Sequence, residues 1–131
     1  MNRREIREQL FVLLFQKEFY GEAFEEERDL YLQTKEWSEK DRQYITERLQ
    51  GVMSHLPEID GRIAENSKGW QIDRIGKEEL AILRLSLYEA LFDDEIPVGV
   101  AVNEAVELGK MYGAEGGAAF INGILGNIVN E

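Results

Sequence analysis

The segment LAILRLSLYEALF at residues 80–92 constrains the fold of this chain more than any other feature. At helical spacing its leucines form one apolar stripe, and alanine, isoleucine and phenylalanine occupy most of the other sides. A helix that is apolar nearly all round is stable only when other helices cover it. The segment therefore predicts a buried central helix with the rest of the fold organised around it.

Helix signals also dominate the rest of the chain. The sequence contains only two prolines, and β-branched residues never form the alternating run, bounded by turns, that a strand requires. No linker, low-complexity tract or internal repeat interrupts the pattern. We therefore expect one all-α domain over residues 1–131 with about seven helices, near residues 3–20, 22–34, 38–54, 57–67, 80–92, 97–112 and 117–129.

Several helix ends carry recognisable capping residues. Gly21 is suited to end the first helix, because glycine readily adopts the backbone conformation that follows a helix C-terminus. Ser38 and Asp41 have the spacing of a capping box, in which each side chain bonds to the other residue's backbone N–H. Pro57 fits a first helical turn, where its missing N–H costs nothing, and Gly69 is expected to end that helix.

Composition bounds the class of protein. The chain has 131 residues, of which 44% are apolar, so it is long enough for one domain with a hydrophobic core. No apolar run approaches the roughly 18 residues of a membrane span, and no signal-peptide cleavage site follows the N-terminus, so we expect a soluble cytoplasmic protein. The formal net charge of −11 disfavours nucleic-acid binding, because attraction to phosphate dominates such affinity. Any RNA contact must therefore rest on a local basic patch.

The segment GAEGGAAFINGILG at residues 113–126 holds five of the twelve glycines. It lacks the spacing of a phosphate-binding loop and follows no strand. Gly113 is expected to end one helix, and Gly116 or Gly117 to begin the next. Gly123 and Gly126 are predicted to let the last helix pack closely on another helix. The alternative is that the loop and the helix start offer backbone N–H groups to an anion.

No motif predicts catalysis or a metal site. The chain has no cysteine and a single histidine, His55, whose neighbours Leu56 and Pro57 favour a surface or half-buried residue over a catalyst. The acidic runs at residues 25–27 and 93–95 would suit a hard cation, but a solvated helix face and a helix N-terminus explain them better. We expect no enzyme activity, no cofactor, no metal and no small-molecule substrate.

The first helix carries three distinct surfaces. Isoleucine and leucine form one apolar stripe, and Phe11, Phe15 and Phe19 form a second stripe more than a quarter-turn away. Arginines occupy the sector between the stripes. Either both stripes are core and the arginines solvate the helix end, or the aromatic residues face a partner and the arginines contact phosphate. The arginines concerned are Arg3, Arg4 and Arg7.

Two charged residues, Arg84 and Glu89, interrupt the apolar central helix. A charge in such a helix must be paired or must face outward. Either these residues form internal ion pairs, with the arginine able to reach solvent instead, or Glu89 marks a face that a partner uses.

Five segments of the sequence resemble the NusB family of transcription antitermination proteins, in the same order along the chain. Together they cover nearly the whole chain, and the likeness is weakest over residues 22–36. Each segment is modest alone, whereas five in register are specific. The segments are RREIREQLFVLLFQ at residues 3–16, GWQIDRI at 69–75, ILRLSLYEALF at 82–92, IPVGVAVNEAVELGKMYG at 96–113 and FINGILGNI at 120–128.

The resemblance implies a non-enzymatic bacterial factor made of two packed helical bundles, about residues 1–54 and 55–131. It implies binding to boxA-type RNA of nascent ribosomal RNA transcripts together with the ribosomal small-subunit protein NusE, within the RNA polymerase antitermination complex. Carried over by position, it places the protein-partner surface at Phe15 and Glu89. It places the RNA surface at Arg3, Arg4, Arg7, Tyr112, Glu115, Gly116, Phe120 and Asn122.

Two departures from the family pattern weaken the expected affinity for RNA. The N-terminal segment is shorter and less basic than in some members, and Gly116 and Gly117 stand where polar residues are common. One alternative is therefore a protein-only helical adaptor, which the acidic charge favours and the retained arginines oppose. The other is a NusB-like RNA-binding domain related to ribosomal RNA cytosine methyltransferases, without their catalytic domain.

Overall fold

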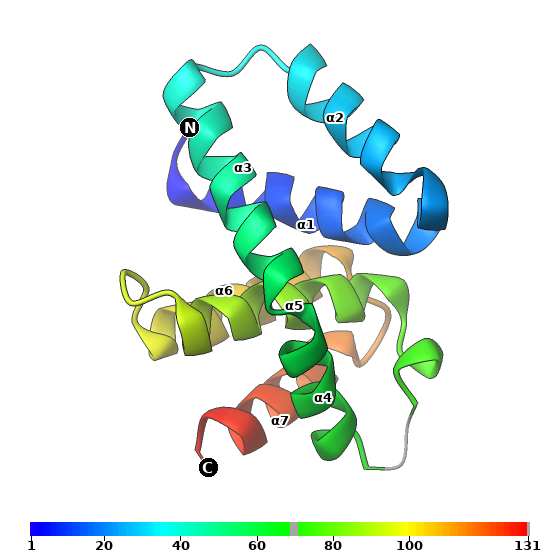
Figure 1. Cartoon of the computed structure of the whole chain (residues 1–131). Helices are drawn as coiled ribbons and strands as arrows, with labels where there is room; N and C mark the ends of the chain where they lie inside the picture. Colours follow the sequence, from blue (N-terminus) through cyan, green and yellow to red (C-terminus); the bar gives the residue numbers. More distant parts are fainter. Residues whose placement is uncertain (69–70, 131) are drawn as a thin grey trace.

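The computed structural model describes residues 1–68 and 71–130. Within these ranges the chain forms seven α-helices and two short 3₁₀ turns and contains no strand, which confirms the predicted all-α class (Figure 1). The 3₁₀ turns, Gly21–Ala23 and Ile72–Arg74, precede the second and fifth helices. The helices are α1 (Arg3–Tyr20), α2 (Phe24–Thr34), α3 (Glu39–Ser54), α4 (Leu56–Asn66), α5 (Lys77–Phe92), α6 (Val98–Tyr112) and α7 (Gly117–Val129).

The α5 helix lies at the centre of the molecule, as its sequence predicts. It contacts α1, α3, α4, α6 and α7, and Figure 1 shows these helices arranged around it. The seven residues from Ala81 to Leu87 are all buried. Because neighbouring helices cover α5 on several sides, this position requires an apolar sequence on most of the helix surface.

The other helices form two groups about α5. The first group is α1, α2 and α3, in which α1 contacts both of the others. The second is α4, α6 and α7, in which α7 contacts both of the others. One hydrophobic core runs through both groups and includes Leu13, Ile45, Leu85 and Ile121. This is the expected pair of helical bundles, and their boundary at residues 54 and 55 remains a prediction.

The start of α3 has the predicted cap, with one difference. The Ser38 hydroxyl oxygen accepts a hydrogen bond from the Asp41 N–H at 3.1 Å, which is one half of a capping box. The Asp41 carboxylate accepts a hydrogen bond from the Met1 ammonium group at 2.9 Å. An ion pair therefore takes the place of the second bond that the spacing of Ser38 and Asp41 suggests.

The α4 and α5 helices differ slightly from their predicted bounds. Pro57 lies in the first turn of α4, as predicted. The helix ends at Asn66, and the predicted stop at Gly69 lies outside the described residues. The α5 helix begins at Lys77, three residues before the apolar segment, because polar residues form its first turn. None of the described helices is both long and apolar enough to cross a membrane.

The glycines of α7 do not serve the close packing that the sequence predicts. A Cβ atom built on Gly123 or Gly126 would meet no neighbouring atom within 4 Å, so that prediction is wrong. The close approach is made by Gly109 of α6, where a Cβ would lie 3.0 Å from the Cα of Ala118 in α7. Gly116 has a φ of 81° and immediately precedes α7, which confirms that a glycine begins this helix.

Substitutions at Gly109 and Gly123 should have opposite effects on stability. Gly109→Val forces α6 and α7 apart, so the free energy of unfolding should fall by about 1–3 kcal/mol. Gly123→Ala fills open space on a helix surface and should raise it by up to about 1 kcal/mol. Urea unfolding followed by circular dichroism measures both changes. A loss of stability in Gly123→Ala would contradict the open environment of that residue.

Candidate nucleic-acid and protein interface

The first two predicted phosphate contacts lie at the exposed start of α1. Asn2 caps this helix by accepting a hydrogen bond from the Glu5 N–H at 2.8 Å. Arg3 is exposed and forms no ion pair with a described residue. Arg4 has a side chain that is 67% exposed, but its guanidinium lies 3.1 Å from Glu104 of α6. Arg3 is therefore free to contact an anion, whereas Arg4 must share its charge with Glu104.

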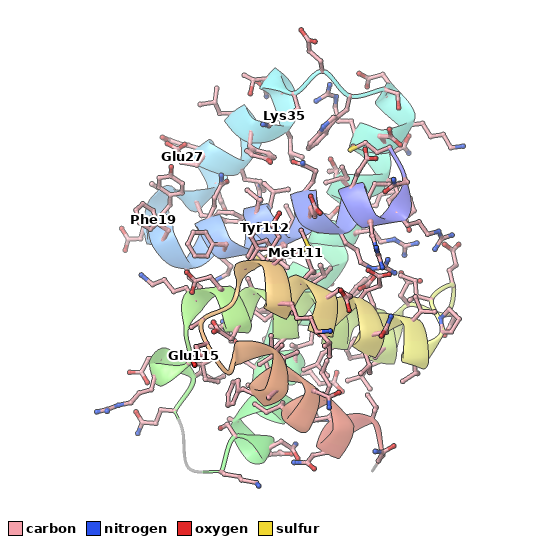
Figure 2. All side chains as sticks on the ribbon, turned by 180° about the vertical axis from the view of Figure 1, so that it is seen from behind. Phe19, Glu27, Lys35, Met111, Tyr112 and Glu115 are labelled. Atoms are coloured by element: carbon pink, nitrogen blue, oxygen red, sulfur yellow. The ribbon has the colours of Figure 1, made fainter. Side chains whose placement is uncertain are left out.

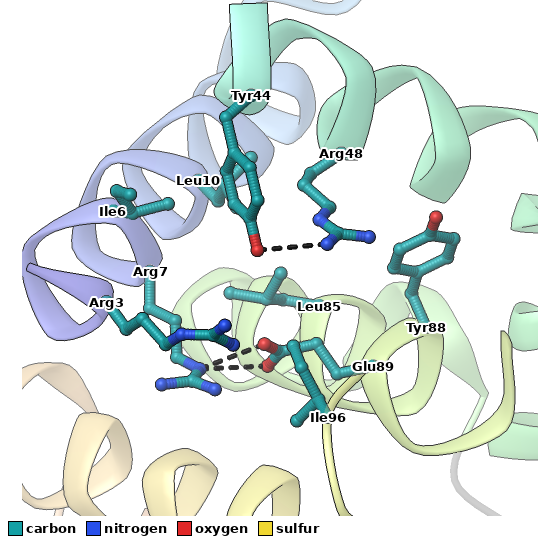
Figure 3. A pocket seen from close by; sticks show the side chains of 10 residues that line it. All are labelled: Arg3, Ile6, Arg7, Leu10, Tyr44, Arg48, Leu85, Tyr88, Glu89 and Ile96. Atoms are coloured by element: carbon teal, nitrogen blue, oxygen red, sulfur yellow. Dashed lines mark hydrogen bonds and ion pairs between the residues drawn. The ribbon is translucent and has the colours of Figure 1, made fainter. Parts of the chain in front are cut away.

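Arg7, the third predicted phosphate contact, is buried. Its side chain and that of Glu89 in α5 are each 7% exposed. The guanidinium Nε of Arg7 donates to both carboxylate oxygens of Glu89, at 3.2 and 2.9 Å (Figure 3). The expectation that Arg7 lies on an RNA surface and Glu89 on a partner surface is therefore corrected. The two residues form an internal ion pair, because α5 covers the sector of α1 that carries Arg7.

The surroundings of this pair shift the titration of Glu89. Burial raises the pKa of Glu89 to about 7, Arg7 opposes the rise, and the nearby Asp93 carboxylate adds to it. Arg48 of α3 lies 2.7 Å from Asp93 and donates to the Tyr44 hydroxyl at 3.0 Å. Arg7, Glu89, Arg48 and Tyr44 line a small hollow of about 20 Å³, and Figure 3 shows them around it. The cluster links α1, α3 and α5 and contains a carboxyl group that titrates near neutral pH.

The loop between α6 and α7 carries the second region of the predicted RNA surface. Glu115 and Gly116 are exposed, and Phe120 in the first turn of α7 is half-buried. Figure 2 shows Glu115 at this corner of the molecule. Together with Arg74 from the 3₁₀ turn before α5, these residues line a hollow of about 240 Å³. The hollow thus brings together the aromatic Phe120, the cationic Arg74 and the backbone of Gly116.

Glu79, which sequence reasoning missed, holds this loop in place. It lies in the first turn of α5, is 6% exposed, and accepts a hydrogen bond from the Ala114 N–H at 3.0 Å. Its other carboxylate oxygen has no hydrogen-bond partner among the described residues. A Cβ on Gly117 would lie 2.8 Å from Glu79 Oε1, so a larger residue there would have to displace this carboxylate. In the sequence Glu79 looks like any acid in a first helical turn, and no signal distinguishes it.

The aromatic stripe of α1 is divided between core and surface. Phe11 is buried and stacks on Tyr112 of α6, with the ring centres 4.8 Å apart. Phe15 is half-buried and Phe19 is 65% exposed. Met111 and Tyr112 are also exposed, and Figure 2 shows them on the same face as Phe19. Neither predicted alternative holds for the whole stripe, because its start belongs to the core and its end to the surface.

Asn122 lies apart from the other predicted RNA residues. It is exposed and lines a groove between α6 and α7 with Val102 and Gly126. Phe120, two positions earlier on the same helix, lines the hollow beside Arg74 instead. An RNA contact at Asn122 stays a prediction.

Arg84 forms the internal ion pairs that one of the two interpretations predicts. Its side chain is 5% exposed, lies 2.9 Å from Asp60 of α4 and also pairs with Glu18 of α1. Burial acts to raise the pKa of Glu18, but the hydrogen bond and charge of Arg84, together with Lys17, outweigh it and lower that pKa below its usual value. Arg84 therefore joins α5 to two other helices.

His55 lies between α3 and α4 and is half-buried, as one of the interpretations predicts. Its ring stacks on Phe92 at the end of α5, with ring centres 4.0 Å apart. In the part of the chain that the structure describes, no three histidine, aspartate or glutamate side chains gather as a metal site would require.

This arrangement of seven helices is the fold of bacterial antitermination proteins. NusB from T. maritima shares it with a TM-score of 0.89 and 34% identity, over 100% of this chain and 92% of that chain. A solved complex of the antitermination factors NusB and NusE with double-stranded RNA also matches, with a TM-score of 0.83 and 26% identity. That match covers 98% of this chain and 96% of the other.

The chain belongs to the NusB family, whose model matches residues 4–130. A transcription antitermination protein NusB from Lachnoclostridium phytofermentans is 43% identical, over 99% of this chain and 100% of the relative. Another, from Acetivibrio thermocellus, is 46% identical over 98% of this chain and 89% of the relative. These relatives are named as antitermination proteins and not as enzymes.

Replacing Glu89 by glutamine should change how stability depends on pH. The folded pKa of about 7 exceeds the ordinary value of about 4.3, so the folded protein binds a proton at Glu89 more tightly than the unfolded chain does. The stability gained from this proton is complete below about pH 4.3 and is lost as the pH rises through about 7. Glutamine does not titrate. The free energy of unfolding of the parent, relative to Glu89→Gln, should therefore be about 2–3 kcal/mol larger at pH 5 than at pH 8.

Urea unfolding at the two pH values measures this difference. Glu36→Gln, at an exposed position after α2, is the matched control and should show a much smaller change with pH. If the difference between the parent and Glu89→Gln is the same at both pH values, the pKa of Glu89 is not raised.

Proposed function

We propose that this protein is a transcription antitermination factor that binds RNA together with the ribosomal protein NusE. The observation that carries the proposal is the match of nearly the whole fold to NusB in a complex that contains NusE and RNA. The names of the curated relatives support it. We infer that the protein acts in the cytoplasm on boxA-type RNA, within the antitermination complex of RNA polymerase, and has no catalytic activity.

We assign the RNA surface to the two ends of a pair of helices. The ion pair between Arg4 and Glu104, and the stacking of Phe11 on Tyr112, place α1 beside α6 in the same direction. From Glu104 to Tyr112 is eight residues, or about 12 Å of helix. RNA that contacts both ends therefore passes along this pair. The proposed contacts are Arg3 and Arg4 at one end, and Tyr112, Glu115, Gly116 and Phe120 at the other.

Replacing Arg3 and Arg4 together by alanine should weaken RNA binding for every sequence. Losing two phosphate contacts on a single strand should make the slope of log K against log salt less steep by about 1.4. Fluorescence anisotropy with a short boxA-type single strand, in the presence of NusE, measures this slope. The matched control is the pair Lys35→Ala and Lys40→Ala, which removes the same charge from two exposed positions, one just after α2 and one in the first turn of α3. Equal losses in the two variants would contradict a local patch.

We place the NusE surface at the exposed end of the aromatic stripe. Phe15 is half-buried, and Phe19 and Met111 are 65% and 59% exposed. Exposed apolar side chains that gather on one face favour a protein partner. The net charge of −11 would also attract a basic ribosomal protein and speed its association. Glu89 is not part of this surface, since Arg7 and the core enclose it.

Truncating Phe15 should weaken NusE binding. An aromatic anchor at an interface typically contributes about 2 kcal/mol, so Phe15→Ala should lower the affinity by about 30-fold. Isothermal titration calorimetry measures the affinity, and thermal unfolding checks that the variant is folded. Leu30→Ala is the matched control, because Leu30 is an apolar residue of α2 that is 56% exposed. An affinity unchanged in a folded Phe15→Ala variant would place the partner surface elsewhere.

A protein-only adaptor is the alternative that one observation favours. Burial of Arg7 and the pairing of Arg4 leave Arg3 as the arginine of this group without an ion pair to a described residue. An adaptor would bind NusE but would show no RNA affinity at low salt, even with NusE present. The anisotropy titration of the parent protein separates the two functions.

A further inference from the structure

A second basic stretch lies far along the chain from the N-terminal arginines. Residues 68–77 contain Lys68, Arg74 and Lys77 and a single acid, Asp73, in a chain of net charge −11. All three cations are exposed, and none has an ion pair with a described residue. Lys77 lies over the Phe19 ring, 5.9 Å from its centre, which leaves Lys68 and Arg74. Exposed cations without an ion pair on so acidic a protein favour an anionic ligand.

This stretch borders two hollows that share one aromatic wall. The first, of about 240 Å³, lies between Arg74 and the start of α7. The second, of about 320 Å³, lies between Lys68, just after α4, and the side of α7 that carries Gly123 and Asn127. Phe120, which is half-buried, lines both hollows and lies between them.

Gly123 has no role in the fold that accounts for it. Nothing lies within 4 Å of the position where its Cβ would be, and glycine in the middle of a helix is less stable than alanine. Because the residue lines the second hollow, the missing side chain keeps that hollow open. It also allows a ligand to approach the backbone of α7 closely.

We propose that this surface is a second RNA contact, on which a single strand crosses α7 with one base in each hollow and the Phe120 ring between them. The inference rests on the proposed function, because it extends the RNA surface beyond Glu115 and Gly116, which line the first hollow. Aromatic stacking and neutralisation of phosphate are the two terms that hold single strands on proteins. Phe120 supplies the first, and Lys68 and Arg74 supply the second.

The charges around the hollows determine which way the strand faces. Glu79 and Glu115 both line the first hollow, where Glu79 is buried and Glu115 is exposed, and the exposed Glu115 carboxylate would repel a phosphate there. The phosphates therefore lie outside, at Lys68 and Arg74, and the bases lie inside, where a carboxylate accepts base N–H groups. An acidic peptide would place its carboxylates beside Glu79 and Glu115, so the lining favours RNA over such a peptide.

Two pairs of variants test the proposal. Each is titrated by fluorescence anisotropy with the short boxA-type single strand, in the presence of NusE. Lys68→Ala with Arg74→Ala should make the salt slope less steep by about 1.4, and the Lys35→Ala and Lys40→Ala control should not change it. Gly123→Leu fills the second hollow and should weaken binding by roughly tenfold through lost stacking. Gly61→Leu is its control, because Gly61 is an exposed helical glycine of α4 that also faces open space but lines neither hollow.

The outcomes separate this inference from the proposed function. If the Lys68 and Arg74 variant binds like its control while the Arg3 and Arg4 variant loses affinity, the second contact is wrong and the proposed function stands. If the parent does not bind RNA with NusE present, both are overturned. If the Lys68 and Arg74 variant loses affinity for NusE in the absence of RNA, the surface is a protein contact and the RNA assignment is wrong.

Discussion

The packing of α1 against α5 is the contact on which the rest of the structure depends. Residues 10–14 of α1 supply apolar side chains to it, and an ion pair lies near each end. Arg7 of α1 pairs with Glu89 of α5, and Arg84 of α5 pairs with Glu18 of α1. Each helix thus gives one cation and one anion, which fixes their antiparallel direction, because the opposite direction would bring like charges together. Removing one partner of such a buried pair typically costs about 3–5 kcal/mol.

This internal use of charge shapes the surfaces that remain. Arg7 and Glu89 hold the core together and leave the exposed start of α1 with less positive charge than its sequence suggests. Arg4 is partly neutralised by Glu104. The acidic protein therefore offers RNA few cations at this end, while its aromatic face and net charge suit a basic protein partner. We therefore expect this modest RNA surface to bind more tightly when NusE is also bound.

The parts of this structure that depend on local chemistry could be predicted from the sequence. The apolar pattern of α5, the Ser38 cap and the proline in α4 each act within a few residues, and all are found. The parts that depend on which helices meet could not. A helical wheel places Arg7 between two stripes but does not show that α5 covers it. Glycine spacing likewise cannot tell Gly109, which touches α7, from Gly123, which touches nothing.

The central place of α5 also has a consequence for how the chain folds as it is made. The first helix is complete at Tyr20, but α5 begins only at Lys77, so its main partner follows after roughly 3–12 seconds of synthesis. Until then the apolar face of α1 has only α2 and α3 to cover it, and the Arg7 guanidinium has no counter-ion. The growing chain therefore exposes the apolar face of an amphipathic helix for seconds. Such a face is a target for a ribosome-associated chaperone and favours aggregation at high expression.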